Sequence, residues 1–369
     1  VYTVTPVSGA QGTCGVASFT ITVTVNPRPE IPNQTATICS GAAFTTTLTN
    51  GTPSATTIVP ASTTYTWTVA ANANVSGQSN QAVGQSTISQ TLTNLTNTTQ
   101  TVVYTVTPTS GAAGACVGPT FTVTVTVNPK PEIPAQTATI CSGTAFTTSP
   151  VNSTPTAATI VPSNTTYTWT VAANANVTGQ SNQATPQSSI SQTLTNLTNV
   201  AQNVVYTVTP TSGDTGNCVG APFTVTVTVN PTPAVTAPAN QVVCHNTNTS
   251  AVSFSGTGTS YTWTNNQTSV GLAASGTGNI VAFNALNPSN SVIATATVSV
   301  TPQFTNNNVT CPGAVQTFTI TVNPIPVVTP MANATFCNGT NTTAIAFGTA
   351  NTGGTTSYTW TNDNTAIGL

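Results

Sequence analysis

Eight cysteines are the residues best placed to do chemistry in this chain, and they recur at matched positions. They are Cys14, Cys39, Cys116, Cys141, Cys218, Cys244, Cys311 and Cys337. An even number of regularly spaced cysteines in a Thr- and Asn-rich chain indicates disulfides formed in an oxidising compartment outside the cytoplasm. Zinc is the competing interpretation, but the sequence has no CxxC pair and its single histidine is His245. We therefore predict disulfides and no metal site.

The remaining titratable groups are too few and too scattered for catalysis. General acid–base chemistry needs two titratable groups within reach of one substrate. The four carboxylates lie in different repeats or at linkers: Glu30, Glu132, Asp214 and Asp363. A nucleophilic site would need His245, which follows Cys244, a predicted disulfide partner. Calcium requires several carboxylate oxygens at one place. We expect no enzyme activity and no cofactor.

The charge content also excludes several partners. The chain of 369 residues has two basic and four acidic side chains, 2% charged in all, against about 25% in an ordinary soluble domain. Nucleic acids and anionic membranes are bound through clusters of Lys and Arg, so neither is expected as a partner. No apolar run approaches the ~20 residues of a membrane span. Hydrophobic residues make up 38% of the chain, so we expect it to fold.

An ungapped internal repeat of 102 residues organises the whole sequence. The repeat superimposes Trp67 on Trp169, and three copies of YTVTP begin at Tyr2, Tyr104 and Tyr206. We expect the C-terminal part of a repeat at 1–27, complete repeats at 28–129 and 130–231, a shorter divergent repeat at 232–324, and the N-terminal part of another at 325–369. Since the chain starts and stops inside a repeat, we expect it to be a window of a longer protein.

Alternating apolar and polar residues predict an all-β repeat. In Phe121–Val127 the aromatic ring and the valines share one face and threonines the other, which is typical of a half-buried antiparallel strand. The equivalent runs are 19–25, 223–229 and 318–322. About seven short strands in some 100 residues favour an immunoglobulin-like β-sandwich. One tryptophan per repeat is the expected core anchor: Trp67, Trp169, Trp263 and Trp360.

Asn-Pro-x-Pro motifs at 26–29, 128–131, 230–233 and 323–326 mark the predicted joints between repeats. Proline fixes φ and biases the preceding residue toward extended geometry, so these linkers should act as semi-rigid spacers. We expect the sandwiches to lie end to end. Four of the six charges lie at joints, and exposed pairs such as Arg28 with Glu30 and Lys130 with Glu132 contribute only about 0–1 kcal/mol.

Two disulfide pairings are compatible with the repeat. The one we predict is within domains: Cys39–Cys116, Cys141–Cys218 and Cys244–Cys311, with Cys14 and Cys337 pairing outside the window. The alternative joins Cys39 to Cys218 across a joint. It arises because the first and last strands of a sandwich run the same way, which would place Cys39 roughly 25 Å from Cys116, whereas a disulfide tolerates about 7 Å between Cα atoms.

Long sequence motifs resemble a known family. The strings TATICSG (35–41), YTWTVAANANVSGQS, SISQTLTNLTN, VVYTVTPTSG and TVTVTVNPKP are similar to the PKD-like, immunoglobulin-fold repeats of very large secreted surface proteins of Bacteroidota, including gliding adhesins. The resemblance implies export by the type IX route and display as a surface fibre. The Asp/Gly-rich turn that often follows the strand tryptophan in PKD domains is replaced here by Thr-Val-Ala-Ala-Asn after Trp67, so no activity of that turn is carried over.

The function we expect is structural: a stalk or filament segment of a large cell-surface adhesin that holds a distal binding region away from the cell. Its partners would be neighbouring repeats, and surface polysaccharide or other cells through regions outside the window. Two other classes remain open. The repeats themselves could bind polysaccharide through exposed aromatic residues, or uncharged edge strands could pair between chains into a fibre or sheath.

Overall fold

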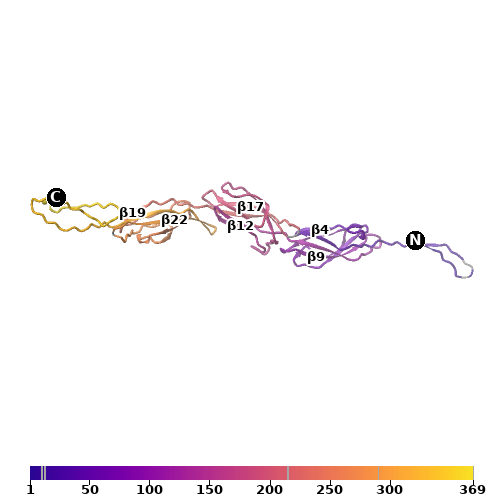
Figure 1. The fold of residues 1–369 in the computed structure, drawn as a ribbon. Coiled ribbons are helices and arrows are strands. Elements are labelled where there is room, and N and C mark those ends of the chain that lie inside the picture. Colours follow the sequence, from indigo (N-terminus) through magenta and orange to yellow (C-terminus); the bar gives the residue numbers. More distant parts are fainter. Residues whose placement is uncertain (10, 12–13, 214–215, 290, 369) are drawn as a thin grey trace.

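The protein is a row of β-sandwiches joined end to end (Figure 1). The computed structural model describes residues 1–9, 11, 14–213, 216–289 and 291–368. A hairpin of β1 (Tyr2–Val4) and β2 (Phe19–Ile21) lies at the N-terminal end, three sandwiches follow, and residues 325–368 extend beyond the third. The all-β, end-to-end architecture predicted from the repeat is thus confirmed.

The first sandwich has two sheets. Its larger sheet has the strand order β3-β10-β9-β5-β7, and its smaller sheet the order β4-β8-β6. The strands are β3 (Gln34–Cys39), β4 (Ala42–Thr46), β5 (Thr64–Val69), β6 (Val75–Ser76), β7 (Gln81–Gln85), β8 (Ile88–Asn94), β9 (Gln100–Thr109) and β10 (Phe121–Asn128). All pairs are antiparallel except that of β3 with β10, which is parallel and aligns Cys39 with Asn128.

The second sandwich repeats the first, strand for strand, with sheets β11-β18-β17-β13-β15 and β12-β16-β14. Its strands are β11 (Gln136–Cys141), β12 (Thr144–Thr148), β13 (Thr166–Val171), β14 (Val177–Thr178), β15 (Gln183–Gln187), β16 (Ile190–Asn196), β17 (Gln202–Thr211) and β18 (Phe223–Asn230). The parallel pair β11 and β18 aligns Cys141 with Asn230. The 102-residue repeat therefore reproduces both the strands and their register.

The third sandwich keeps one sheet, β19-β24-β22-β20-β21, to which β23 adds beside β22. Isolated bridges such as Val252 with Ile280 stand where the second sheet would be. Its elements are β19 (Gln241–Cys244), β20 (Ser260–Asn265), the 3-10 helix η1 (Thr268–Val270), β21 (Ser275–Thr277), β22 (Ala294–Asn306), β23 (Val309–Pro312) and β24 (Gln316–Asn323). The loop that carries a cysteine in the first two sandwiches is here the β-hairpin of β22 and β23.

The alternating residues fill the cores as predicted in the three sandwiches. Phe121, Val123, Val125 and Val127 are buried, and Tyr104 packs against Phe44 at 5.2 Å between ring centroids. The tryptophans predicted as core anchors are buried in these domains, with exposures of 5% for Trp67, 5% for Trp169 and 8% for Trp263.

The two end segments differ from these expectations. The prediction for Trp360 is wrong, because its side chain is 61% exposed. In the third sandwich Trp263 is covered by Gly276 on β21, whereas the one helix or strand assigned within 325–368 is the 3-10 helix η2 (Thr365–Ile367). Similarly, residues 19–25 are strand only over 19–21 and are exposed, since the hairpin has no opposing sheet.

Candidate functional site: the joints between domains

Two disulfides cross the joints. Cys39 is bonded to Cys218 and Cys141 to Cys311, with Cα–Cα distances of 5.6 Å and 5.5 Å. In each bond one sulfur belongs to the last residue of a domain's first strand, and the other to the segment just before the last strand of the next domain. The predicted intradomain pairs Cys39–Cys116, Cys141–Cys218 and Cys244–Cys311 are therefore wrong, and the cross-joint alternative describes the structure.

Strand direction explains the error. The parallel strands β3 and β10 place Cys39 beside Asn128, at the end of β10 that adjoins the next domain. Cys116 precedes Phe121, at the opposite end of the same strand. An eight-residue strand spans about 25 Å at ~3.3 Å per residue, well beyond the ~7 Å that a disulfide allows. The nearest cysteine to Cys39 is thus in the following domain.

Four cysteines form no disulfide in the described part of the chain: Cys14, Cys116, Cys244 and Cys337. Each is equivalent, in the repeat, to a cysteine that forms a cross-joint disulfide in another domain. Cys116 corresponds to Cys218, and its sulfur lies 4.0 Å from the backbone oxygen of Asn26 in the preceding joint. Cys244 ends β19 as Cys141 ends β11.

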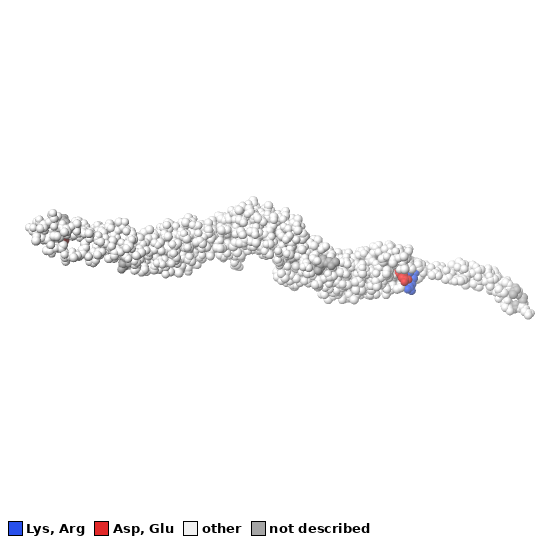
Figure 2. All heavy atoms as spheres, in the orientation of Figure 1, with Lys and Arg blue, Asp and Glu red and all other residues white. Residues whose placement is uncertain are grey.

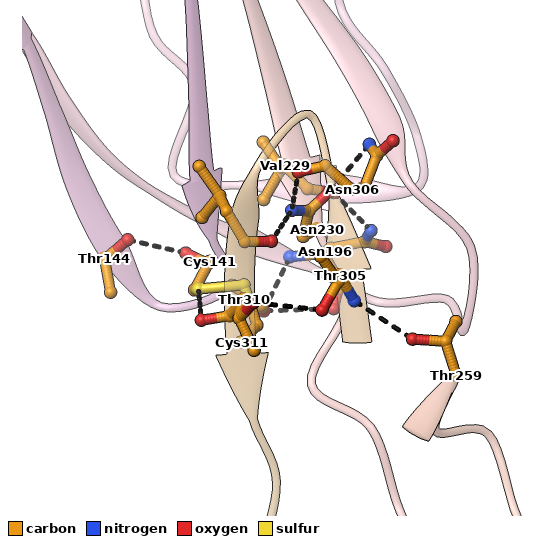
Figure 3. Close-up of a disulfide and its surroundings, with 12 residues drawn as sticks. Cys141, Thr144, Asn196, Val229, Asn230, Thr259, Thr305, Asn306, Thr310 and Cys311 are labelled. Carbon is orange, nitrogen blue, oxygen red and sulfur yellow. Dashed lines mark hydrogen bonds between the residues drawn. A yellow bond between two sulfur atoms is a disulfide. The ribbon is translucent and has the colours of Figure 1, made fainter. Parts of the chain in front are cut away.

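The asparagine of the Asn-Pro-x-Pro motif supplies a second fastening that the sequence did not reveal. Its side chain bonds across the joint at Asn26 and Asn230, whereas Nδ2 of Asn128 is buried without a hydrogen-bond partner among the described residues. Asn230 is fully buried, and its amide nitrogen donates to the backbone oxygens of Asn306 and Val309 in the next domain, both at 3.4 Å. Its side-chain oxygen accepts from Nδ2 of Asn306 at 3.0 Å. Figure 3 shows Asn230 and Asn306 facing each other beside the Cys141–Cys311 bond. The recurrence of Asn at all four joints was the available signal.

The same asparagines hold the cysteine-bearing strand ends through their backbone. The carbonyl oxygen of Asn128 accepts from the amide nitrogen of Ser40 at 2.9 Å, and that of Asn230 accepts from Ser142 at 2.9 Å. At the first joint, Asn26 donates to the backbone oxygen of Ala113. Asn230 therefore both aligns the end of the neighbouring first strand and contacts the hairpin to which that strand is cross-linked.

The second proline of each of the first three motifs, Pro29, Pro131 and Pro233, packs closely against a glycine. A Cβ added to Gly220 would lie 2.4 Å from the backbone oxygen of Pro131, and one added to Gly313 would lie 1.8 Å from that of Pro233. Pro131 and Pro233 are buried. Because only glycine permits this approach, the linker is held against the cysteine-bearing loop of its own domain.

His245 has a local structural role that the sequence did not reveal. Its Nδ1 accepts from the backbone nitrogen of Asn287 at 2.8 Å. In the first sandwich, Oγ of Ser40 accepts from the backbone nitrogen of Asn94 at 3.0 Å in the same way. The histidine thus replaces a serine at the turn after the first strand. Among the described residues, no group of three His, Cys, Asp or Glu side chains could hold a metal ion.

Charged side chains are sparse at the surface. On the face seen in Figure 2 nearly every atom is uncharged, and charges of both signs gather at one place toward the N-terminal end. Arg28, Glu30, Lys130 and Glu132 are exposed, and a crevice of about 300 Å³ at the joint of the first two sandwiches includes Lys130 and Glu132 in its wall. Asp214 lies outside the described residues. The joints are therefore held by disulfides, amides and prolines.

Comparison with known proteins identifies the repeat. The family model of the PKD-like domain matches residues 36–131 and 138–233, more than half of the chain. The chain belongs to the PKD-like domain family. The two matched PKD-like domains are the first and second sandwiches, whose joint carries the Cys39–Cys218 bond. No curated protein matches the sequence.

Solved structures with a similar arrangement are tandem domain fragments. The three N-terminal domains of the outer capsid protein Hoc of bacteriophage RB49 match at 14% identity and a TM-score of 0.39, covering 78% of this chain and 95% of that one. The EC22-24 fragment of mouse cadherin-23 matches at 12% identity and 0.26, covering 80% and 97%. The I9-I11 tandem of titin matches at 12% identity and 0.24, covering 80% and 98%. Likenesses of this size say nothing of function.

Proposed function

We propose that this chain is a stalk or filament segment of a large extracellular adhesin, which holds a distal binding region away from the cell surface. The observation that carries the proposal is the pair of cross-joint disulfides, Cys39–Cys218 and Cys141–Cys311. A string of independent binding modules needs no cross-link between neighbours beyond the backbone. A spacer gains stiffness from each disulfide that crosses a joint. The row of sandwiches in Figure 1 has the shape that a spacer requires.

An extracellular location is supported by the disulfides and by the PKD-like family. No helix in the described part of the chain is long and apolar enough to span a membrane. Attachment to the cell surface, a role in gliding and type IX export are proposed from the motif resemblance. The domain boundaries 28–129, 130–231 and 232–324 are proposed from the repeat.

The unpaired cysteines extend the proposal to adjoining repeats. Cys14 and Cys116 lie in the position of Cys218, and Cys244 and Cys337 in the position of Cys141. We propose that each forms the same cross-joint bond with a further PKD-like domain. Neighbouring repeats of the same protein would then be the main partners of this segment.

Polysaccharide binding is a second candidate, favoured by one observation. Trp360 and Phe347 line an apolar groove of about 360 Å³, and Phe347 stacks on Tyr358 at 5.4 Å between ring centroids. Exposed aromatic faces of this kind can stack on sugar rings. However, the equivalent Trp263 is covered by its own domain, so we rank this function second.

Self-assembly through sheet edges is less well supported. The edge strand β15 contains Pro186, which lacks the backbone N–H that a pairing strand would use. The pairing of β13 with β15, and that of β5 with β7, is interrupted by a register shift. Both devices protect edges from neighbouring chains.

Two measurements test the stalk. Single molecules viewed by electron microscopy should be isolated rods with a narrow spread of end-to-end distances; compact particles or spontaneous bundles would count against a spacer. Antibodies raised against the chain should label intact, non-permeabilised cells of the source. Labelling only after permeabilisation would refute a surface stalk.

A glycan array tests the second candidate separately. Binding of the purified chain to the array would favour polysaccharide binding as the function.

A further inference from the structure

Each of the two joints between the three sandwiches is crossed by two covalent connections, the backbone and a disulfide, and these two connections exchange strands. At the joint between the first two sandwiches, the backbone runs from the end of β10 through Pro129–Pro131 to β11. The disulfide runs from Cys39 at the end of β3 to Cys218, just before β18. The last strand of one domain thus leads to the first strand of the next, and the first strand leads to the last.

Within each domain these two strands are neighbours. β3 and β10 pair in parallel over six residues, as do β11 and β18. Both strands run from one joint to the next, so a pull along the row is carried lengthwise by two adjacent strands. The remaining strands of the second sandwich, β12 to β17, lie between Cys141 and Cys218 in the sequence.

The overlapping disulfides provide a covalent detour around every domain. If the first sandwich unfolds, tension passes from β3 through Cys39–Cys218 into the second. If the third unfolds, tension leaves the second through Cys141–Cys311 and continues along β24. If the second unfolds, the short segment from Asn128 to Cys141, followed by Cys311, still joins its neighbours. The same routes remain when any two of the three have unfolded.

We propose that this crossed pattern makes the segment a fail-safe tether, whose length is kept when any one or any two of its sandwiches unfold. The proposal deepens the stalk function by naming its mechanical property, and it rests on that function only for its biological use. An unfolded domain of about 100 residues would otherwise add some 350 Å at about 3.5 Å per residue. With both bonds intact, the shortest covalent route from residue 30 to residue 324 is about 100 residues instead of nearly 300. Complete unfolding should therefore give one long increase in length instead of three.

The proposal makes a numerical prediction for single-molecule stretching of the whole chain held at its two ends. The oxidised protein should show one long release of roughly 80 residues, the span from Cys141 to Cys218 at about 3.5 Å per residue, and only after all three sandwiches have opened. After treatment with a thiol reductant, the same folded protein should show three long releases of about 90 to 100 residues each. Three long releases from the oxidised protein would overturn the proposal.

Variants locate the effect. In Cys39→Ser, unfolding of the first sandwich should lengthen the tether by about 100 residues, while unfolding of the second and third should give no long release. In Cys141→Ser, only unfolding of the third sandwich should give a long release. The matched controls Cys116→Ser and Cys244→Ser remove cysteines that form no disulfide in the described chain and should leave the oxidised trace unchanged. Because the reductant acts on protein that has already folded, the test holds even if a variant folds poorly. The result is independent of the microscopy and cell labelling that test the stalk.

Discussion

Cys39 and Asn128 lie side by side at the ends of two parallel strands, β3 and β10. That register places the cysteine at the joint and leaves the domain's other cysteine, Cys116, beyond the opposite end of β10. The asparagine in turn binds the residue after the cysteine through its carbonyl oxygen, which accepts from Ser40 at 2.9 Å. Cross-linking between domains therefore follows from the direction of two strands.

Replacing Gly220 with alanine should destabilise the second sandwich. The new methyl group would lie 2.4 Å from the backbone oxygen of Pro131 and 2.8 Å from the ring of Pro210, and overpacking of this kind costs about 1–3 kcal/mol. Thermal unfolding followed by circular dichroism measures the loss. Val219→Ala is the matched control, since Val219 is exposed; an equal loss in both variants would show that the proline contact is not the cause.

Asn230→Ala should weaken the joint between the second and third sandwiches. The variant removes the side-chain donor to the backbone oxygens of Asn306 and Val309, and a hydrogen bond of this kind contributes about 0.5–1.5 kcal/mol. We expect lower unfolding free energy and faster hydrogen exchange in 306–309. Asn323→Ala is the control, because the half-buried Asn323 faces no equivalent loop in the described chain. Unchanged exchange in Asn230→Ala would contradict a fastening role for this side chain.

Stability should fall in alkaline solution through buried tyrosines. Burial raises the pKa of Tyr104 to about 12 and that of Tyr167 to about 12, above the ordinary value of about 10. The folded state therefore keeps protons that the unfolded state loses, so stability is constant below about pH 10 and declines as pH rises to about 12, by about 1.4 kcal/mol per pH unit for each tyrosine.

Urea unfolding between pH 8 and 12 measures this slope. Tyr104→Phe should reduce it by one tyrosine's share, although the variant also loses the hydrogen bond from the phenol to Gln90 at 2.8 Å and so begins from a lower stability. The exposed Tyr2 provides the control variant Tyr2→Phe. A slope that Tyr104→Phe does not change would place the alkaline loss elsewhere.

The sequence predicts the fold because repeat and alternation are local signals. The run Phe121–Val127 specifies its own buried face, and the 102-residue shift carries it to 223–229, where the same burial recurs. Trp360 shows the limit of this reasoning, since burial of a side chain needs strands from elsewhere in the domain, and no strand is assigned within 325–368 to cover it.

The joint was predicted only in part, for a related reason. Prolines act on their own backbone and could be interpreted from sequence, whereas the partners of Asn230 and Cys141 lie in another domain. Choosing between Cys116 and Cys218 as the partner of Cys39 required the direction of the first strand relative to the last. Once that direction is known, the distance limit of a disulfide decides the pairing.

Peptide mapping of the folded protein under non-reducing conditions tests the central claim most directly. Digestion should release one disulfide-linked pair of peptides containing Cys39 and Cys218, and a second containing Cys141 and Cys311. Both pairs should separate on reduction. Recovery of Cys39 linked to Cys116, or of Cys141 linked to Cys218, would contradict the cross-joint account and restore a row of independently closed domains.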